Sequence, residues 1–211
     1  MTDSSIPVVN HHADHPGFGG VAGAAIGFFM LFMGRGNARL TVDLASVSEG
    51  DRVVDIGCGP GTAARAAARR GASVVGIDPA TVMLRLAGIA ARRDASINWA
   101  RGTAEALPLT DEWASVVWSL KTVHHWQDVT AGLTEVRRVL APTGRFLVIE
   151  RRVKPGATGL ASHGWTEQQA ERFAAQCRAT GFEGVRVAEH RHGRNAAWTV
   201  QAVQPGQATL S

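Results

Sequence analysis

Val53-Val54-Asp55-Ile56-Gly57-Cys58-Gly59-Pro60-Gly61-Thr62 is the stretch of this sequence that decides the fold. The β-branched residues at its start suit a buried parallel strand. Three glycines then alternate with other residues, which predicts a turn whose backbone a ligand can approach closely. The run of alanine and arginine over 62–70 is typical of a helix, and Gly71 is a suitable end for it. Because N–H groups at a helix start favour an anion, this unit predicts a phosphate or carboxylate site.

The glycine spacing leaves two ligand classes to compare. Dinucleotide enzymes use G-x-G-x-x-G, with a ribose-binding acid about 20 residues further on. Here the third glycine, Gly61, comes one place early, and Asp55 sits two residues before the first glycine. That arrangement resembles motif I of the class I S-adenosylmethionine-dependent methyltransferases, E/D-x-G-x-G-x-G. The resemblance favours a methyltransferase over a nicotinamide dehydrogenase.

Length and charge narrow the class of protein. A chain of 211 residues can bury one α/β domain and is short for two. The formal net charge is +4, and no basic block is interleaved with aromatic residues, so we expect no nucleic-acid partner. Cys58 and Cys177 are far apart and lack metal-ligand spacing. We therefore expect a reduced, cytoplasmic protein with no metal site.

The apolar segment 18–33 could be mistaken for a membrane span. It is shorter than a typical span, contains four glycines and lacks the basic start of a signal peptide. We interpret residues 1–50 as an N-terminal lid that covers the substrate and 51–211 as the cofactor-binding domain. A membrane-surface or homodimer role for residues 18–33 is the alternative.

Strands and helices alternate along most of the chain, which predicts a parallel sheet with helices on both faces. Such sheets bind ligands at the carboxyl ends of their strands. We expect strands at 53–56, 73–77, 97–100, 115–120, 145–150, 185–189 and 196–203. We expect helices at 37–47, 62–70, 81–92, 128–140 and 166–180.

Four sequence blocks in order resemble the small-molecule class I methyltransferases of the ubiquinone/menaquinone-biosynthesis-like superfamily. They are DIGCGPG (55–61), VVGIDPA (74–80), GTAEALPL (102–109) and EVRRVLAPTGRFLVIE (135–150). The resemblance implies a Rossmann-like, doubly wound α/β fold with seven strands in the order 3-2-1-4-5-7-6 and strand 7 antiparallel. It also implies S-adenosyl-L-methionine as cofactor and S-adenosyl-L-homocysteine as product.

Asp78 is the candidate ribose ligand. It lies 17 positions after Gly61, and a carboxylate can accept hydrogen bonds from both vicinal hydroxyls. A role as helix N-cap is the alternative, and the two roles are compatible. The cofactor-binding residues that the resemblance implies are Asp55, Gly57, Cys58, Gly59, Asp78, Pro79, Met83, Thr103, Ala104, Glu105 and Leu120. Thr103 departs from the family pattern, which usually has Asp there.

Three residues are candidates for catalysis, namely His124, His125 and Glu150. Transfer to a hydroxyl needs a base, and histidine suits that role near neutral pH. A structural role for each histidine, and a surface ion pair for Glu150 with Arg151 or Arg152, are the alternatives.

The acceptor is poorly constrained. His11, His12 and His15 belong to a flexible tail, a substrate-facing lid or, as the weakest interpretation, a metal site. His163 and Trp165 are candidates to line the acceptor pocket. We predict O-methylation of a small polar acceptor, with a sugar as one candidate because several tryptophans could stack on it. Carbon methylation of a quinone or lipid, and cofactor binding without transfer, are the alternatives.

Overall fold

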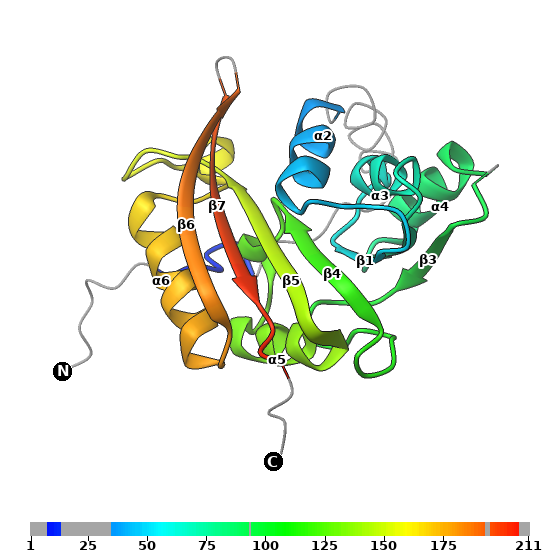
Figure 1. Cartoon of the computed structure of the whole chain (residues 1–211). Helices are drawn as coiled ribbons and strands as arrows, with labels where there is room; N and C mark the ends of the chain where they lie inside the picture. The colour runs from blue at the N-terminus through cyan, green and yellow to red at the C-terminus, as the bar shows by residue number, and fades with distance from the viewer. Residues whose placement is uncertain (1–7, 14–34, 93, 193–194, 207–211) are drawn as a thin grey trace, which may run out of the picture.

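The computed structural model describes residues 8–13, 35–92, 94–192 and 195–206 (Figure 1). His15 and the apolar segment 18–33 lie outside these residues. No helix within the described ranges is long and apolar enough to cross a membrane.

One seven-stranded sheet forms the centre of the molecule, in the order β3-β2-β1-β4-β5-β7-β6. The strands are β1 (Arg52–Ile56), β2 (Ser73–Asp78), β3 (Ile97–Arg101), β4 (Ala114–Leu120), β5 (Leu140–Arg151), β6 (Glu183–His192) and β7 (Asn195–Val203). Strands β1 to β5 are parallel, and β7 is antiparallel to both β5 and β6. The predicted order and the antiparallel strand are both confirmed.

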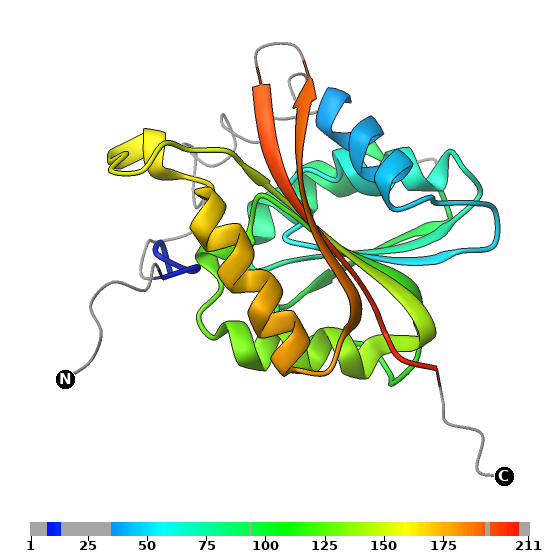
Figure 2. The same ribbon diagram turned by 60° about the vertical axis from the view of Figure 1, so that its left-hand side comes forward.

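Helices cover both faces of the sheet (Figures 1 and 2). They are α2 (Arg35–Leu44), α3 (Thr62–Ala68), α4 (Thr81–Ala90), α5 (Val129–Val139) and α6 (Glu167–Ala179), with short 3₁₀ helices η1 (Val123–His125) and η2 (Gly159–Ser162). Two apolar clusters result, one with residues of α2 and α3 and one with residues of α5 and α6. Adjacent residues of β4 point to opposite faces of the sheet and so belong to different clusters. Trp118 lies in one cluster and Val117 in the other.

Strand β5 begins earlier than the sequence predicts. The pattern over 142–144 predicts a break before a strand at 145, but β5 starts at Leu140, which pairs with Ala114. The pairing then shifts register, so the Pro-Thr-Gly segment bulges within the strand instead of ending the helix in a separate loop.

The described residues of the N-terminal part of the chain pack against the rest of the domain. Ala38 and Val42 of α2 are buried in the cluster that contains residues of β1 and α3. Residues 8–13 are also fixed, with Val9 only 2% exposed. A domain boundary at residue 50 therefore does not coincide with a break in packing among the described residues, and a flexible tail does not describe residues 8–13.

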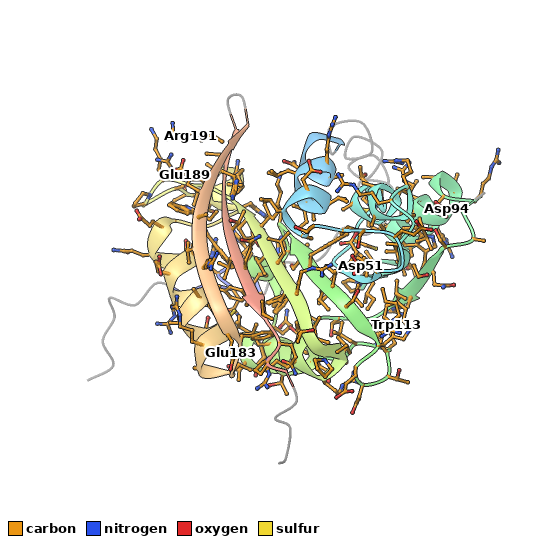
Figure 3. The ribbon with its side chains drawn as sticks, in the orientation of Figure 1. Asp51, Asp94, Trp113, Glu183, Glu189 and Arg191 are labelled. Carbon is orange, nitrogen blue, oxygen red and sulfur yellow. The ribbon has the colours of Figure 1, made fainter. Side chains whose placement is uncertain are left out.

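Polar contacts at the amino ends of the strands hold β1, β4 and β5 together. Asp51, labelled in Figure 3, accepts hydrogen bonds from Ser115 Oγ at 2.7 Å and from Arg145 Nη2 at 2.8 Å. Ser115 therefore supports the sheet far from the carboxyl ends of the strands.

Candidate cofactor and acceptor site

The glycine turn, residues 57–61, joins β1 to α3 in a conformation that needs glycine. Gly57, Gly59 and Gly61 have φ of 70°, 52° and 75°. A Cβ on Gly57 would also lie 2.4 Å from Cγ2 of Thr122. The backbone N–H groups of Gly57 and Cys58 both donate to the carbonyl of Ile77, which fixes the turn against β2.

Asp78 lies directly behind this turn, at the end of β2. Its Oδ2 accepts from the N–H of Gly59 at 2.9 Å and its Oδ1 from the N–H of Ala80 at 2.8 Å. Burial raises the pKa of this carboxyl. Each oxygen retains capacity for a further donor, as two ribose hydroxyls would supply. Ala80 is the N-cap of α4, so Asp78 does not have the capping role that was the alternative.

Asp55 is a buried acid, and one of its carboxylate oxygens has no hydrogen-bond partner among the described residues. Burial raises its pKa to about 7, and the nearby Asp78 contributes to that rise. The Trp118 indole faces it and lowers the pKa, but the geometry is too poor for a hydrogen bond. Within the described residues, Asp55 Oδ2 and Trp118 Nε1 both lack a hydrogen-bond partner. At 1% exposure this carboxylate is enclosed beneath the glycine turn, and the backbone N–H of Ala64 also acts to lower its pKa.

The glycine turn and Asp78 fit a ligand with vicinal hydroxyls, and the other predicted cofactor residues differ in exposure. Met83, Ala104 and Cys58 are buried, Leu120 is half-buried, and Pro79 and Thr103 are exposed. Glu105 Oε1 accepts from the N–H of Gln127 at 2.8 Å, so its carboxylate is partly committed to the loop before α5.

Thr122 connects the glycine turn to the segment that carries the candidate bases. Its Oγ1 donates to the carbonyl of Ile56 at 3.2 Å, and it lies 2.6 Å from Ser119 Oγ. The next residues form η1, which presents His124 and His125. Sequence reasoning missed Thr122, because a threonine in a loop carries no signal of its own.

His124 and Glu150 form a buried pair at the ends of β4 and β5. His124 Nδ1 lies 2.9 Å from Glu150 Oε2, and the other carboxylate oxygen accepts from the N–H of Val123 at 2.9 Å. Their side chains are 3% and 0% exposed. Glu150 therefore has no surface ion pair with Arg151 or Arg152. Its carboxylate is too enclosed to touch an acceptor, and it orients His124 instead.

His124 is part of a histidine cluster, which we define as His12, His124, His125 and His163. The His12 and His163 rings stack with centroids 4.1 Å apart, and the His124 and His125 centroids are 4.2 Å apart. Burial lowers the pKa of His125 to about 4, and the neighbouring His124 contributes. His125 is therefore neutral at pH 7 and a weaker base than an ordinary histidine.

Residues 8–13 hold this cluster from outside the sheet. The N–H of His12 donates to the carbonyl of His124 at 2.9 Å, and the carbonyl of His12 lies 3.3 Å from His125 Nδ1. His11 bonds the Ser162 carbonyl through Nε2 and the Gln169 side-chain amide through Nδ1. His11 and His12 thus lie beside His124 and His125, where both ring nitrogens of His11 bond other protein groups, and a substrate role for them stays a prediction.

Trp165 does not line an open pocket. Its side chain is fully buried in the core around α6, and Nε1 donates to the carbonyl of Val9 at 3.0 Å. Trp118 and Trp126 are buried as well. Trp113 directly precedes β4 and lies at the amino ends of the strands (Figure 3), away from the histidines. These four tryptophans therefore offer no stacking surface for a sugar beside the histidine cluster.

Known proteins that resemble this chain are methyltransferases. Residues 54–148 match a family model described as a methyltransferase domain. A ubiquinone biosynthesis O-methyltransferase of Rhizobium johnstonii is 36% identical over 115 residues, 53% of this chain and 46% of that protein. A demethylmenaquinone methyltransferase of Tropheryma whipplei is 33% identical over 112 residues, 53% of this chain and 46% of that protein. The chain thus spans about half the length of these curated relatives.

A solved structure shares the fold across most of the chain. A SAM-dependent methyltransferase from Aquifex aeolicus superposes with a TM-score of 0.66 at 17% identity, covering 79% of this chain and 89% of that one. The strand order, the glycine turn and the match over 54–148 together support a class I S-adenosylmethionine-dependent methyltransferase.

Proposed function

We propose that this chain transfers a methyl group from S-adenosylmethionine to a hydroxyl oxygen of a small molecule. The observation that carries the proposal is the buried Glu150–His124 pair, which lies next to the glycine turn through Thr122. An oriented, carboxylate-backed imidazole is the arrangement that general-base catalysis requires. Methylation of a nucleophile without proton transfer would not need it.

The cofactor half of the site has distinct tasks. The bound cofactor supplies an electrophilic methyl group on a sulfonium. Asp78 would accept the ribose hydroxyls, and the glycine turn would let the methionine part approach the backbone. Met83 and Ala104 would contact the adenine.

The acceptor half removes a proton. With Nδ1–H donated to Glu150, His124 presents Nε2 as the base. The acceptor oxygen attacks the methyl carbon, the S–C bond breaks as the O–C bond forms, and the hydroxyl proton passes to His124. Glu150 stabilises the imidazolium that forms. S-adenosylhomocysteine and the methyl ether are the products.

A quinone or lipid acceptor, methylated on carbon, is the second candidate. The names of the two curated relatives refer to quinone metabolism and favour a quinone-like acceptor, but they do not favour carbon over oxygen, since the first names an O-methyltransferase. A sugar is less favoured than the tryptophan content suggests, since Trp118, Trp126 and Trp165 are buried.

We retain a covering role for residues 1–50, with His15 and the segment 18–33, as a proposal. A cytoplasmic location is supported by two buried, unpaired cysteines.

The test is formation of S-adenosylhomocysteine from labelled cofactor with a panel of phenols, sugars, quinones and lipids. We expect an O-methylated product, and a His124→Ala variant should lose at least about a hundredfold in turnover. Cofactor affinity should not change in that variant. His190→Ala, on β6, is the matched control and should behave as the parent.

Two results would redirect the proposal. A product methylated on carbon, with His124→Ala within about tenfold of the parent, would replace oxygen transfer by the quinone alternative. Tight cofactor binding without product from any acceptor would favour a cofactor-binding module.

A further inference from the structure

Three histidines converge on one point beside the candidate base. Among the described residues, His124, His125 and His163 each offer a ring nitrogen, and these three atoms lie within 4.8 Å of one another. His124 and His125 come from η1, whereas His163 directly follows η2, about 40 residues later in the chain. No metal-ligand spacing in the sequence indicates this grouping, and the expectation from the sequence alone is that no metal binds.

The surroundings of two of these histidines are those of metal ligands. A metal-bound histidine usually donates its second ring N–H to a carboxylate or a backbone carbonyl. His124 Nδ1 is paired with Glu150 Oε2 at 2.9 Å, and His125 Nδ1 faces the His12 carbonyl at 3.3 Å. Both contacts set the tautomer so that Nε2 is the lone-pair nitrogen. Glu150 is itself fixed by the Val123 N–H.

His11 shows the contrast within the same region. Its Nε2 lies 2.9 Å from the Ser162 carbonyl and its Nδ1 lies 3.1 Å from the Gln169 amide nitrogen. Both ring nitrogens are therefore used by the protein, as expected of a structural histidine. His124 and His125 each have only one ring nitrogen so engaged in the contacts above.

We propose that His124, His125 and His163 bind one divalent transition metal of the zinc type. Imidazole nitrogens favour Zn²⁺, Cu²⁺ and Ni²⁺ over Mg²⁺ or Ca²⁺. Tetrahedral Zn–N bonds of about 2.0–2.1 Å place ligand nitrogens about 3.4 Å apart, so the rings need to close by about an ångström. Three protein ligands leave one position open, as in catalytic zinc sites.

The open position would let the metal bind the acceptor hydroxyl. Only this catalytic role of the metal rests on the proposed function. A hydroxyl bound to the metal has a lowered pKa and is deprotonated near neutral pH. His124 would then act as a ligand, and the metal would replace it as the group that generates the nucleophile. Binding of the metal itself requires no acceptor and no methyl transfer.

The experiment is equilibrium dialysis of the metal-free full chain, without a histidine tag, against Zn²⁺, followed by Co²⁺ substitution. We expect one Zn²⁺ per chain with a Kd of about 1 µM or tighter. Bound Co²⁺ should give visible bands of a four-coordinate site. His163→Ala should abolish stoichiometric binding, and Glu150→Gln should weaken it by about tenfold to a hundredfold. His190→Ala should match the parent.

Cofactor affinity, measured on every variant, identifies a variant that has failed to fold. The proposal is overturned if the folded parent binds no stoichiometric Zn²⁺, or if His163→Ala binds as tightly as the parent while His190→Ala does too. Because dialysis uses no acceptor, an inactive enzyme that still binds Zn²⁺ would count against the proposed function and not against the metal site.

Discussion

The glycine turn is made from five consecutive residues, whereas the histidine cluster collects residues from positions 12 to 163. Both lie at the carboxyl edge of the sheet and are joined through Thr122. The turn is fixed by backbone conformation and hydrogen bonds to β2. The cluster is fixed by docking residues 8–13 and the loop after β5 onto η1. The cofactor half should therefore withstand changes that disrupt the acceptor half, and the predictions below test that independence.

The largest effect is expected from Gly57→Ala. The substitution combines a positive φ of 70° with a Cβ 2.4 Å from the Thr122 side chain. The backbone strain and the steric clash together should lower the free energy of unfolding by about 3–5 kcal/mol and weaken cofactor binding. Gly50→Ala is the control, because Gly50 also has a positive φ but nothing within 4 Å of the added Cβ. It should cost only about 1–2 kcal/mol in urea unfolding, and equal losses would mean that Thr122 moves away freely.

Stability should also depend on pH through Asp55. Its pKa is about 7 in the folded chain against an ordinary value of 3.8 in the unfolded chain, so the folded chain binds more protons between these values. The raised pKa adds to the free energy of unfolding. This contribution is fully present below pH 3.8 and is lost as pH rises through about 7. This contribution amounts to up to about 4 kcal/mol. Asp55→Asn should flatten the decline in a series of urea titrations, and an unchanged slope would assign the pH dependence elsewhere.

An effect of intermediate size is expected from Asp78→Ala. Losing charge-assisted hydrogen bonds to two hydroxyls should weaken cofactor binding by about 10–100-fold. Zinc binding at the histidine cluster should not change, because no contact joins Asp78 to that cluster in the described residues. Asp94→Ala (Figure 3) is the matched control, since the Asp94 side chain accepts hydrogen bonds from Ser96 within the described residues and lies far from Asp78 in sequence. Calorimetric titration checks both, and a loss of zinc binding would show that the two halves are coupled.

The smallest effect is expected from Trp165→Phe. The change keeps most of the buried ring but removes the hydrogen bond to the Val9 carbonyl, at a cost of about 1 kcal/mol. Residues 8–13 should become more accessible to protease while cofactor binding stays the same. Trp113→Phe, at the opposite edge of the sheet, should leave the cleavage pattern unchanged. Equal protection in both variants would mean that Val9 is held by its packing alone.

The cofactor half was predictable because its information is local. A strand, a glycine turn and an acid at a fixed distance predict Asp55, Gly57 and Asp78 as cofactor residues without any knowledge of distant contacts, and the structure has the strand and the turn. The seven-stranded order followed from the family resemblance and is confirmed.

The acceptor half was only partly predictable. His124, His125, His163 and Glu150 were singled out, but their mutual arrangement was not, because it depends on packing between segments more than 100 residues apart. Glu150 reads in sequence as an acid beside two arginines, and only burial shows that it serves His124. Trp165 reads as a binding aromatic for the same reason, since sequence gives its polarity but not its depth.

The position of Glu150 sets a limit on how this domain can be transplanted. The segment that matches the methyltransferase family ends at residue 148, two residues before Glu150 and well before His163. A chimaera that moved only residues 54–148 into another methyltransferase would carry the cofactor cradle, His124 and His125, but neither the carboxylate behind His124 nor the third histidine. Under the proposed function, acceptor choice in such a chimaera would come from the recipient, because Glu150 and His163 lie outside the segment that matches the family model.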